Sequence, residues 1–385
     1  MTKSKIYKII GGLFIIGLIA GFVVYSNLTN RHKAILKTTI LYKSGLVDAD
    51  WKIEKHRSEY KMISPDFYID GIYKSMEGPK ASNYIRLTED SSLVWITDFH
   101  VRALDAKTRK YISKDFICHL NVDFNDANYY SSLGLENRIG KQYPRMATLS
   151  HGVENFALPK GYGVPMKGNQ WLLATTQSLN HNIADANYLI KHEVTIGYHK
   201  DDQQTRPLMC RAVYIQLPFD KQDPYKEPMD PAANQCTPIE TKNHVYVDGQ
   251  GNTYSGHWLI KPGKKIYRSN VDNQLMISDS MRLHAAAVHA HPMSRYITLF
   301  DSTTNQPVFT SKIQNHQNKI GIDYISPFLS EKGIWLYKNH HYELILEVNN
   351  TSGKDQDMMG SMFLFFYDQE LDQLLHKQKK LALKK

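Results

Sequence analysis

Residues 283–293 have the sequence Leu-His-Ala-Ala-Ala-Val-His-Ala-His-Pro-Met, and the β-branched and aromatic run Tyr296–Phe300 follows them. This composition favours extended strands. Residues two apart in a strand point to the same face, so His289 and His291 are predicted to place both imidazoles on one face. Two imidazoles on one strand face can begin a metal site. The alternative is a half-exposed strand in a chain that carries 17 histidines.

Short strand-like segments continue along the chain on both sides of this stretch. They are separated by turns rich in Gly, Asn, Asp and Pro. The pattern predicts an all-β protein of antiparallel β-sandwich or jelly-roll type, rather than alternating strands and helices. A chain of 385 residues is long enough for two domains. The polar run 200–207 is the predicted boundary, which gives domains at residues 40–203 and 207–368.

The N-terminus carries an apolar segment, residues 9–25, with no charged residue and with Lys3, Lys5 and Lys8 before it. Residues 1–30 are therefore predicted to be a signal anchor or a signal peptide. The lysines favour a cytoplasmic N-terminus, so we expect an exported body in the periplasm or extracellular space, held at the membrane through residues 9–25. Residues 26–40 are predicted to form a short polar stalk, and residues 369–385 a basic amphipathic tail.

The net charge of +9 lies largely at the two ends of the chain. No basic stripe with interleaved aromatic residues occurs between them, so nucleic acid is not an expected partner. Three cysteines are compatible with an oxidising compartment. Cys210 and Cys236 flank a proline-rich loop and are candidates for a disulfide. The alternative is that all three cysteines are reduced and buried.

A second informative segment covers residues 348–368. A turn leads through an acidic patch into a strongly apolar strand, and Met358, Met359 and Met362 stand at its beginning. Thioethers are soft ligands that suit copper(I) better than zinc or iron. Two histidines and a methionine would therefore suit a copper that changes oxidation state. The alternative is that the methionines fill the core of a sandwich.

These segments resemble the copper type II, ascorbate-dependent monooxygenases, which include peptidylglycine hydroxylating monooxygenase and dopamine beta-hydroxylase. The shared order is Pro262-Gly263, the His-Ala-His strand and, much later, a methionine before an apolar aromatic strand. The resemblance implies two tandem jelly-roll domains. It also implies that His289, His291 and Met359 bind the copper at which oxygen is activated, with Met358 as the alternative in register.

The first half is similar to the family in the strand Phe116–Phe124 and in the segment that ends at residues 180–182. The resemblance implies that His119 and His181 bind a second, electron-transfer copper. Cys118 stands where the family has a further histidine, so this site is degraded, and Cys118 or Asn121 are its alternative donors. Residues 256–258 (Gly-His-Trp) are similar to the stress-upregulated nodulin-like branch, which makes His257 a candidate ligand or a neighbour of the ligands.

The resemblance implies an exported copper-dependent monooxygenase that hydroxylates a C–H bond. It would use oxygen, one or two coppers and a reductant such as ascorbate. Because Cys118 replaces a histidine, the alternative is a non-catalytic copper-binding protein for storage, delivery or sensing on the same scaffold. A third hypothesis is a metal-free protein that binds another envelope component. The sequence does not identify the substrate, whether small molecule or peptide, and it suggests no partner for His100 or His151.

Overall fold

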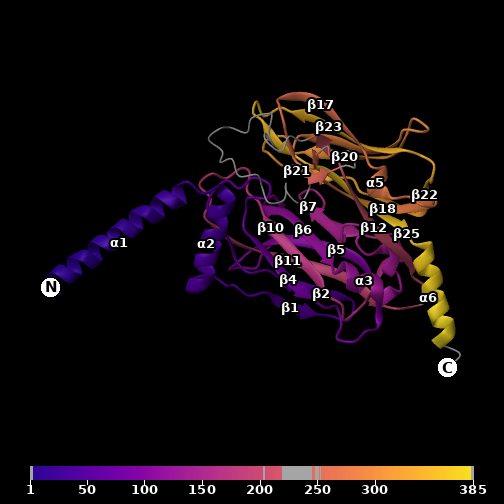
Figure 1. Cartoon of the computed structure of the whole chain (residues 1–385), viewed down its shortest axis with the longest axis horizontal. Helices are drawn as coiled ribbons and strands as arrows, with labels where there is room; N and C mark the ends of the chain where they lie inside the picture. The colour runs from indigo at the N-terminus through magenta and orange to yellow at the C-terminus, as the bar shows by residue number, and fades with distance from the viewer. Residues whose placement is uncertain (1–2, 203, 219–244, 248–250, 252, 383–385) are drawn as a thin grey trace.

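The computed structural model describes residues 3–202, 204–218, 245–247, 251 and 253–382 (Figure 1). The chain is predominantly β, with several sheets and an apolar N-terminal helix, which confirms the predicted fold class at this level. Figure 1 shows the strands gathered into one body, with the helices α1 and α6 extending from it.

The strands of the first half form two sheets. One contains β1 (Lys52–Lys55), β2 (Glu59–Ile63), β3 (Phe67–Ile69), β5 (Leu93–Asp105), β8 (Asn155–Ala157), β9 (Tyr162–Lys167) and β11 (Tyr188–Lys200). The other has the order β4 (Lys80–Ile85), β10 (Leu172–Ser178), β6 (Ile117–Phe124) and β7 (Arg145–Ser150). The short helix η1 (Lys114–Phe116) lies between β5 and β6 and so connects the two sheets, whereas α3 (Asp126–Leu133) and η2 (Glu136–Arg138) lie between β6 and β7.

The second half adds four strands to the first of these sheets and forms further sheets of its own. The added strands are β12 (Arg206–Tyr214), β25 (Gly360–Tyr367), β18 (Met281–Ala290) and β22 (Phe328–Leu336). A five-stranded sheet has the order β17 (Gly263–Asn270), β23 (Tyr342–Asn350), β19 (Ser294–Asp301), β20 (Gln306–Asn315) and β21 (Ile322–Ile325). Smaller pairings join β16 (Trp258–Ile260) to β24 (Gln356–Met358), and β13 (Leu217–Pro218) and β14 (Val245–Val247) to β15 (Thr253–Ser255); the short helix α5 (Asp272–Leu275) precedes β18.

One sheet therefore continues from the first half into the second. The connection is the pair β9–β12, in which Arg206 lies opposite Tyr162; it is parallel, whereas every other pair between described strands is antiparallel. The polar run 200–207, predicted as a domain boundary, lies between the ends of β11 and β12. The chain is thus polar where it passes between the halves, while the hydrogen-bonded sheet runs across them.

The core is centred on β25, which lies between β12 and β18. Its residues Met362–Phe366 are all buried, since a strand with neighbours on both edges and cover on both faces needs apolar side chains on both faces. Phe363 and Phe365 lie opposite Ala287 and Ala285 of β18. The ring of Phe365 lies 5.3 Å from the ring of Phe156 on β8, so this face packs against the first half.

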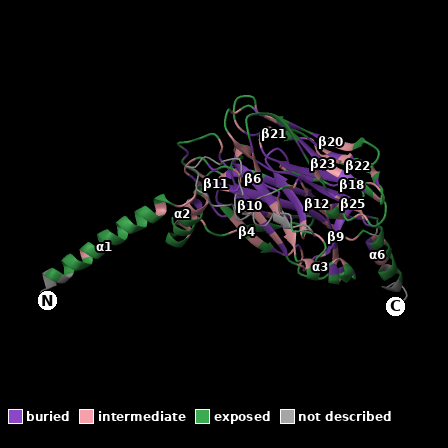
Figure 2. Ribbon diagram, turned by 45° about the horizontal axis from the view of Figure 1, so that its top comes forward, coloured by how far each residue is buried: buried purple, intermediate pink, exposed green. Residues whose placement is uncertain are grey.

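The N-terminal helix α1 (Lys3–Ser26) projects away from the body, and nearly all of its described side chains are exposed (Figure 2). Within it, Tyr7–Ser26 is long and apolar enough to cross a membrane. Most of residues 26–40, predicted as a polar stalk, belong to helix α2 (Asn30–Ser44). Thr29 caps α2 by accepting a hydrogen bond from the His32 N–H, and Lys37 pairs with Asp70 at 2.7 Å.

The C-terminal segment forms the helix α6 (Gln369–Ala382), so the described part of the predicted tail is helical. Leu371 and Leu375 are buried on its inner side. Asp368, immediately before the helix, accepts a hydrogen bond from Arg138 at 2.9 Å, and Arg138 also pairs with Glu370. These contacts hold the start of α6 against the body.

Candidate metal centre

The strand register places two of the predicted histidines and one methionine on a common face. His289 of β18 lies opposite Ser361 of β25, and two residues further along the same register the His291 N–H donates to the Met359 carbonyl at 3.4 Å. Directly opposed side chains of an antiparallel pair share a face, as do residues two apart. His289, His291 and Met359 therefore lie together on the face that also carries Phe363 and Phe365.

Met358 points the other way. It is fully buried in the hydrophobic core, and its Sδ accepts a hydrogen bond from Ser294 Oγ at 3.3 Å. Met359 is also buried but is not part of that core cluster. Of the two methionines named in the sequence, the register thus supports Met359 as the neighbour of the histidines and gives Met358 a packing role.

Three buried histidines meet at this point. The ring centroids of His289 and His291 are 5.4 Å apart, and those of His257 and His291 are 5.8 Å apart. His257 comes just before β16, whose first residue Trp258 pairs with Met358, so one further step along the ladder brings His257 beside Met359. The histidine that the sequence suggested only as a lesser candidate therefore belongs to the group.

An aspartate that the sequence reasoning missed completes the arrangement. Asp357 Oδ2 lies 2.8 Å from Nδ1 of His291 and 3.6 Å from Nε2 of His257. Burial opposes ionisation of this carboxyl, but the two imidazoles outweigh it and hold the pKa of Asp357 well below its usual range. The donor atoms of His257, His291 and Asp357 all lie within 4.8 Å of one another.

The pairing with Asp357 determines which nitrogen of His291 is available. Its Nδ1 faces the carboxylate, while its Nε2 is buried and has no hydrogen-bond partner among the described residues. Metal-binding histidines commonly donate their second ring N–H to a carboxylate, which orients the ring and fixes the tautomer. Asp357 lies two residues before Met359 in an extended segment. Strand alternation would therefore have predicted Asp357 on the same face as Met359.

The predicted first-half site is less complete. On β6, His119 Nδ1 lies 3.3 Å from Cys118 Sγ, and burial lowers the pKa of His119 to about 3, so its imidazole is neutral at physiological pH. The side-chain oxygen of Asn121 accepts a hydrogen bond from Thr148 of β7 at 2.8 Å, which uses it within the sheet. Met76, which the sequence did not single out, packs against Cys118 and adds a second sulfur.

His181 lies in the loop after β10. Its Nδ1 is buried and makes no hydrogen bond to any described residue, and burial lowers its pKa to about 4. The charged groups that act on His181 are Asp357, His151, His291 and Asp115. Among the described residues, neither His119 nor His181 belongs to a group of three convergent His, Cys, Asp or Glu donors.

The described residues also form a second donor group and a large cavity. Asp115, His151 and His316 form a second group whose donor atoms lie within 4.8 Å of one another. A cavity of about 870 Å³ lies beside α6 and β12, but no member of either donor group lines it. Cys210 lies on its wall, whereas Cys236 is outside the described residues, and with it the predicted disulfide.

Comparison with known proteins gives little further guidance. No protein-family model matches the chain, and no curated protein matches it. Among solved structures, PNGase F, a glycosylasparaginase from Flavobacterium meningosepticum, is similar with a TM-score of 0.34 and 9% identity, over 80% of this chain and 96% of that one. The major capsid protein P2 from bacteriophage PM2 is similar with a TM-score of 0.30 and 10% identity, over 80% and 97%. Likeness at this level carries no inference about function.

Proposed function

We propose that this chain is an exported copper protein that hydroxylates a C–H bond with oxygen and an external reductant such as ascorbate, at a copper held by His289, His291 and Met359. In this proposal the body consists of two tandem jelly-roll domains, and α1 anchors it to the membrane. The observation that carries the proposal is the shared face of these three buried donors, with Nε2 of His291 oriented by Asp357.

The donor set fits copper. Imidazole nitrogen suits both oxidation states of copper. A thioether favours copper(I), and zinc and iron sites seldom use a thioether ligand. A copper bound there would supply oxygen binding and one-electron chemistry. The chain's own part is to keep the donors dry and fixed: His291 is held by Asp357, and the ladder between β18 and β25 sets the spacing of His289, His291 and Met359.

The face on which the donors lie is directed toward the first half. His119 lies close enough to His291 for the two rings to affect each other electrostatically, and His181 is similarly close to both His291 and Asp357. Because burial keeps His119 and His181 neutral, their ring nitrogens are in the protonation state that binds metal. In the proposal these two residues, with Cys118, would hold a second copper that relays electrons.

A second candidate function is copper storage, delivery or sensing without turnover. The observation that favours it is the incomplete first-half site, where His119 has Cys118 beside it and His181 stands apart. Without an electron relay, a single copper would bind but turn over slowly or not at all. Both candidates require the same site on β18 and β25, and they differ only in catalysis.

The test uses the full chain in detergent, loaded with copper(I), desalted and analysed for bound metal. We expect His291→Ala and Met359→Leu to lose the copper of this site, and Met358→Leu to retain it. Leucine has nearly the volume of methionine, so both methionine variants should fold, at a stability cost below about 1.5 kcal/mol. Equal copper content in the two methionine variants would refute the ligand assignment.

Oxygen consumption with ascorbate then separates the two functions. The monooxygenase proposal expects uptake above the rate of the same amount of free copper, lost in His291→Ala and in Met359→Leu. Copper retained by the wild type without such uptake, across peptide and amine substrates, would refute catalysis and leave the binding function.

A further inference from the structure

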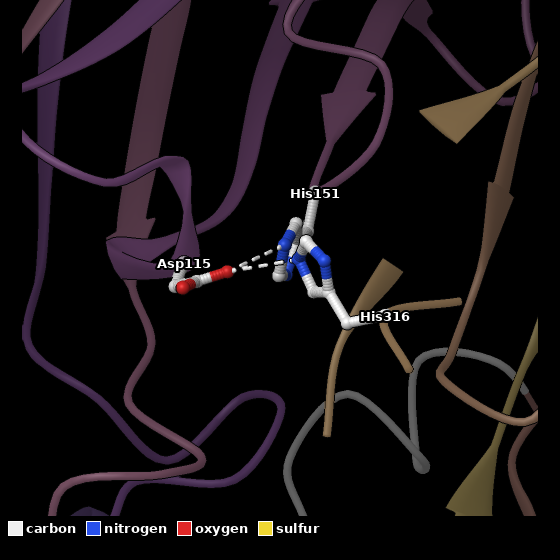
Figure 3. A group of neighbouring side chains, drawn as sticks. All are labelled: Asp115, His151 and His316. Carbon is white, nitrogen blue, oxygen red and sulfur yellow. Dashed lines mark ion pairs between the residues drawn. The ribbon is translucent and has the colours of Figure 1, made fainter. Parts of the chain in front are cut away.

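A second group of donors lies between the two halves of the protein. Asp115 belongs to η1, His151 to the turn after β7, and His316 follows β20, so the first two come from one half and the third from the other. Figure 3 shows the three side chains directed toward one point. Oδ1 of Asp115 lies 3.2 Å from Nε2 of His151 and 3.3 Å from Nε2 of His316.

These short contacts are ion pairs whose angles fall outside those of well-formed hydrogen bonds. Oδ1 of Asp115 and Nε2 of both histidines are buried, and none of the three has a hydrogen-bond partner among the described residues. Buried polar atoms are normally hydrogen-bonded, so three unsatisfied atoms at one point require a reason. A shared cation would satisfy all three at once.

The spacing matches that expected around a small metal ion. Bonds of about 2.0–2.1 Å in a tetrahedral site place neighbouring ligand atoms about 3.3 Å apart. The two distances from Asp115 to the imidazoles have this value. Two imidazoles and one carboxylate, with no sulfur, are donors typical of zinc and other divalent transition metals rather than of copper(I).

The surroundings hold these donors in place. Gly321 closes over both rings in a left-handed conformation (φ +146°), and a Cβ at this position would lie only 3.0 Å from His151 Cε1 and 3.2 Å from His316 Cδ2. Ile320 and Asn182 exchange two hydrogen bonds, at 2.8 and 3.0 Å, which fix the loop that carries His316 to the first half. The site is thus built from a docked loop, not from mobile surface side chains.

One cation of the protein already lies at this site. Lys319 pairs with the second oxygen of Asp115. Burial opposes ionisation of Asp115, but its contacts with His151 and Lys319 prevail and hold its pKa well below the usual range. The Lys319 side chain is 38% exposed, so its ammonium can move into solvent.

We propose that Asp115, His151 and His316 bind one divalent transition metal, with zinc as the test ion, and that the bound metal joins the two halves. In this arrangement Lys319 neutralises Asp115 in the absence of metal and competes with the metal for the carboxylate. The site is independent of the copper site on β18 and β25, because the two share no ligand.

The role of Lys319 provides a test that distinguishes a metal site from an ion-pair network. Zinc binding is measured by equilibrium dialysis on the full chain in detergent, in a His291→Gln background that disables the other donor group. We expect one zinc per chain. His316→Gln should weaken zinc binding at least about tenfold, as loss of even an orienting neighbour does. Lys319→Gln should strengthen it, because a competing positive charge is removed.

The matched control is His340→Gln. His340 forms a single pair with Asp301 at 2.6 Å, also in the second half, and its replacement should leave zinc binding unchanged. Far-UV circular dichroism shows whether each variant is folded. If the His291→Gln background does not fold, the comparison is made in the wild-type background, where the wild type should bind one zinc more than His316→Gln. No bound zinc, equal binding by His316→Gln, or weaker binding by Lys319→Gln would each overturn the proposal.

Discussion

The low pKa of His192 should make the free energy of unfolding depend on pH. This residue of β11 is fully buried: its Nδ1 lies 2.6 Å from Thr176 Oγ1, its Nε2 lies 3.2 Å from the Phe116 carbonyl, and its ring packs edge-on against Phe67. Burial lowers its pKa to about 4, only partly offset by the hydrogen bond to Phe116. His192 is not a member of either donor group, so its titration can be followed in metal-free protein.

The sign and size of the effect follow from linkage. Between pH 6.5 and pH 4 the unfolded chain binds a proton at this position that the folded chain does not, so the free energy of unfolding falls as the pH falls. With an unfolded pKa of about 6.5 and a folded pKa of about 4, the loss between pH 7 and pH 5 is about 2 kcal/mol. At pH 7 the contribution is close to zero because the imidazole is neutral in both states.

The assay compares urea unfolding of the wild type and His192→Gln at pH 7 and pH 5, in chelator-treated buffer. The stability advantage of the wild type over His192→Gln should shrink by about 2 kcal/mol between the two pH values. His56→Gln is the control, because the His56 side chain is exposed, and it should preserve the wild-type dependence. Parallel pH dependences for the wild type and His192→Gln would refute the reasoning.

Three further outcomes are expected. Phe365→Ala should lower the free energy of unfolding in urea by about 3–5 kcal/mol, because it opens a cavity where the halves meet. Gly78→Ala should lower the melting temperature strongly, since its Cβ would lie 2.2 Å from the Ser178 carbonyl oxygen, whereas Gly71→Ala, with 3.9 Å to its nearest neighbour, should be tolerated. Deletion of residues 1–26 should leave the circular dichroism spectrum of the body unchanged and move the protein from the membrane fraction to the soluble fraction, because nearly all of the described side chains of α1 are exposed.

Periodicity predicted those parts of the fold that depend on neighbouring residues. The alternation around His289 and His291 identified β18, and the apolar run after Met359 identified β25. Helix α2 was not predicted, because its sequence is polar and its position depends on Thr29 as a cap and on the distant Asp70. The parallel pair β9–β12 also has no local signal, since it joins segments from different halves.

The same distinction applies to the donor groups. His289, His291 and Met359 could be named from the sequence because strand alternation and one ladder relate them. His151 and His316 are separated by 165 positions and follow strands of different sheets, so no spacing rule connects them. In the sequence Asp357 is only one member of an acidic patch, because its role depends on two imidazoles that other segments bring to it.

The continuous sheet across β9 and β12 has a mechanical consequence. Any hinge-like opening of the halves would have to break main-chain hydrogen bonds, among them that from the Arg206 N–H to the Gly161 carbonyl at 2.9 Å, and also separate Phe156 from Phe365. Clam-shell closure around a bound molecule would therefore cost this protein the free energy of these contacts. Local rearrangement of loops and side chains, by contrast, would give access to the histidines and leave the pairing of the donor-bearing strands intact.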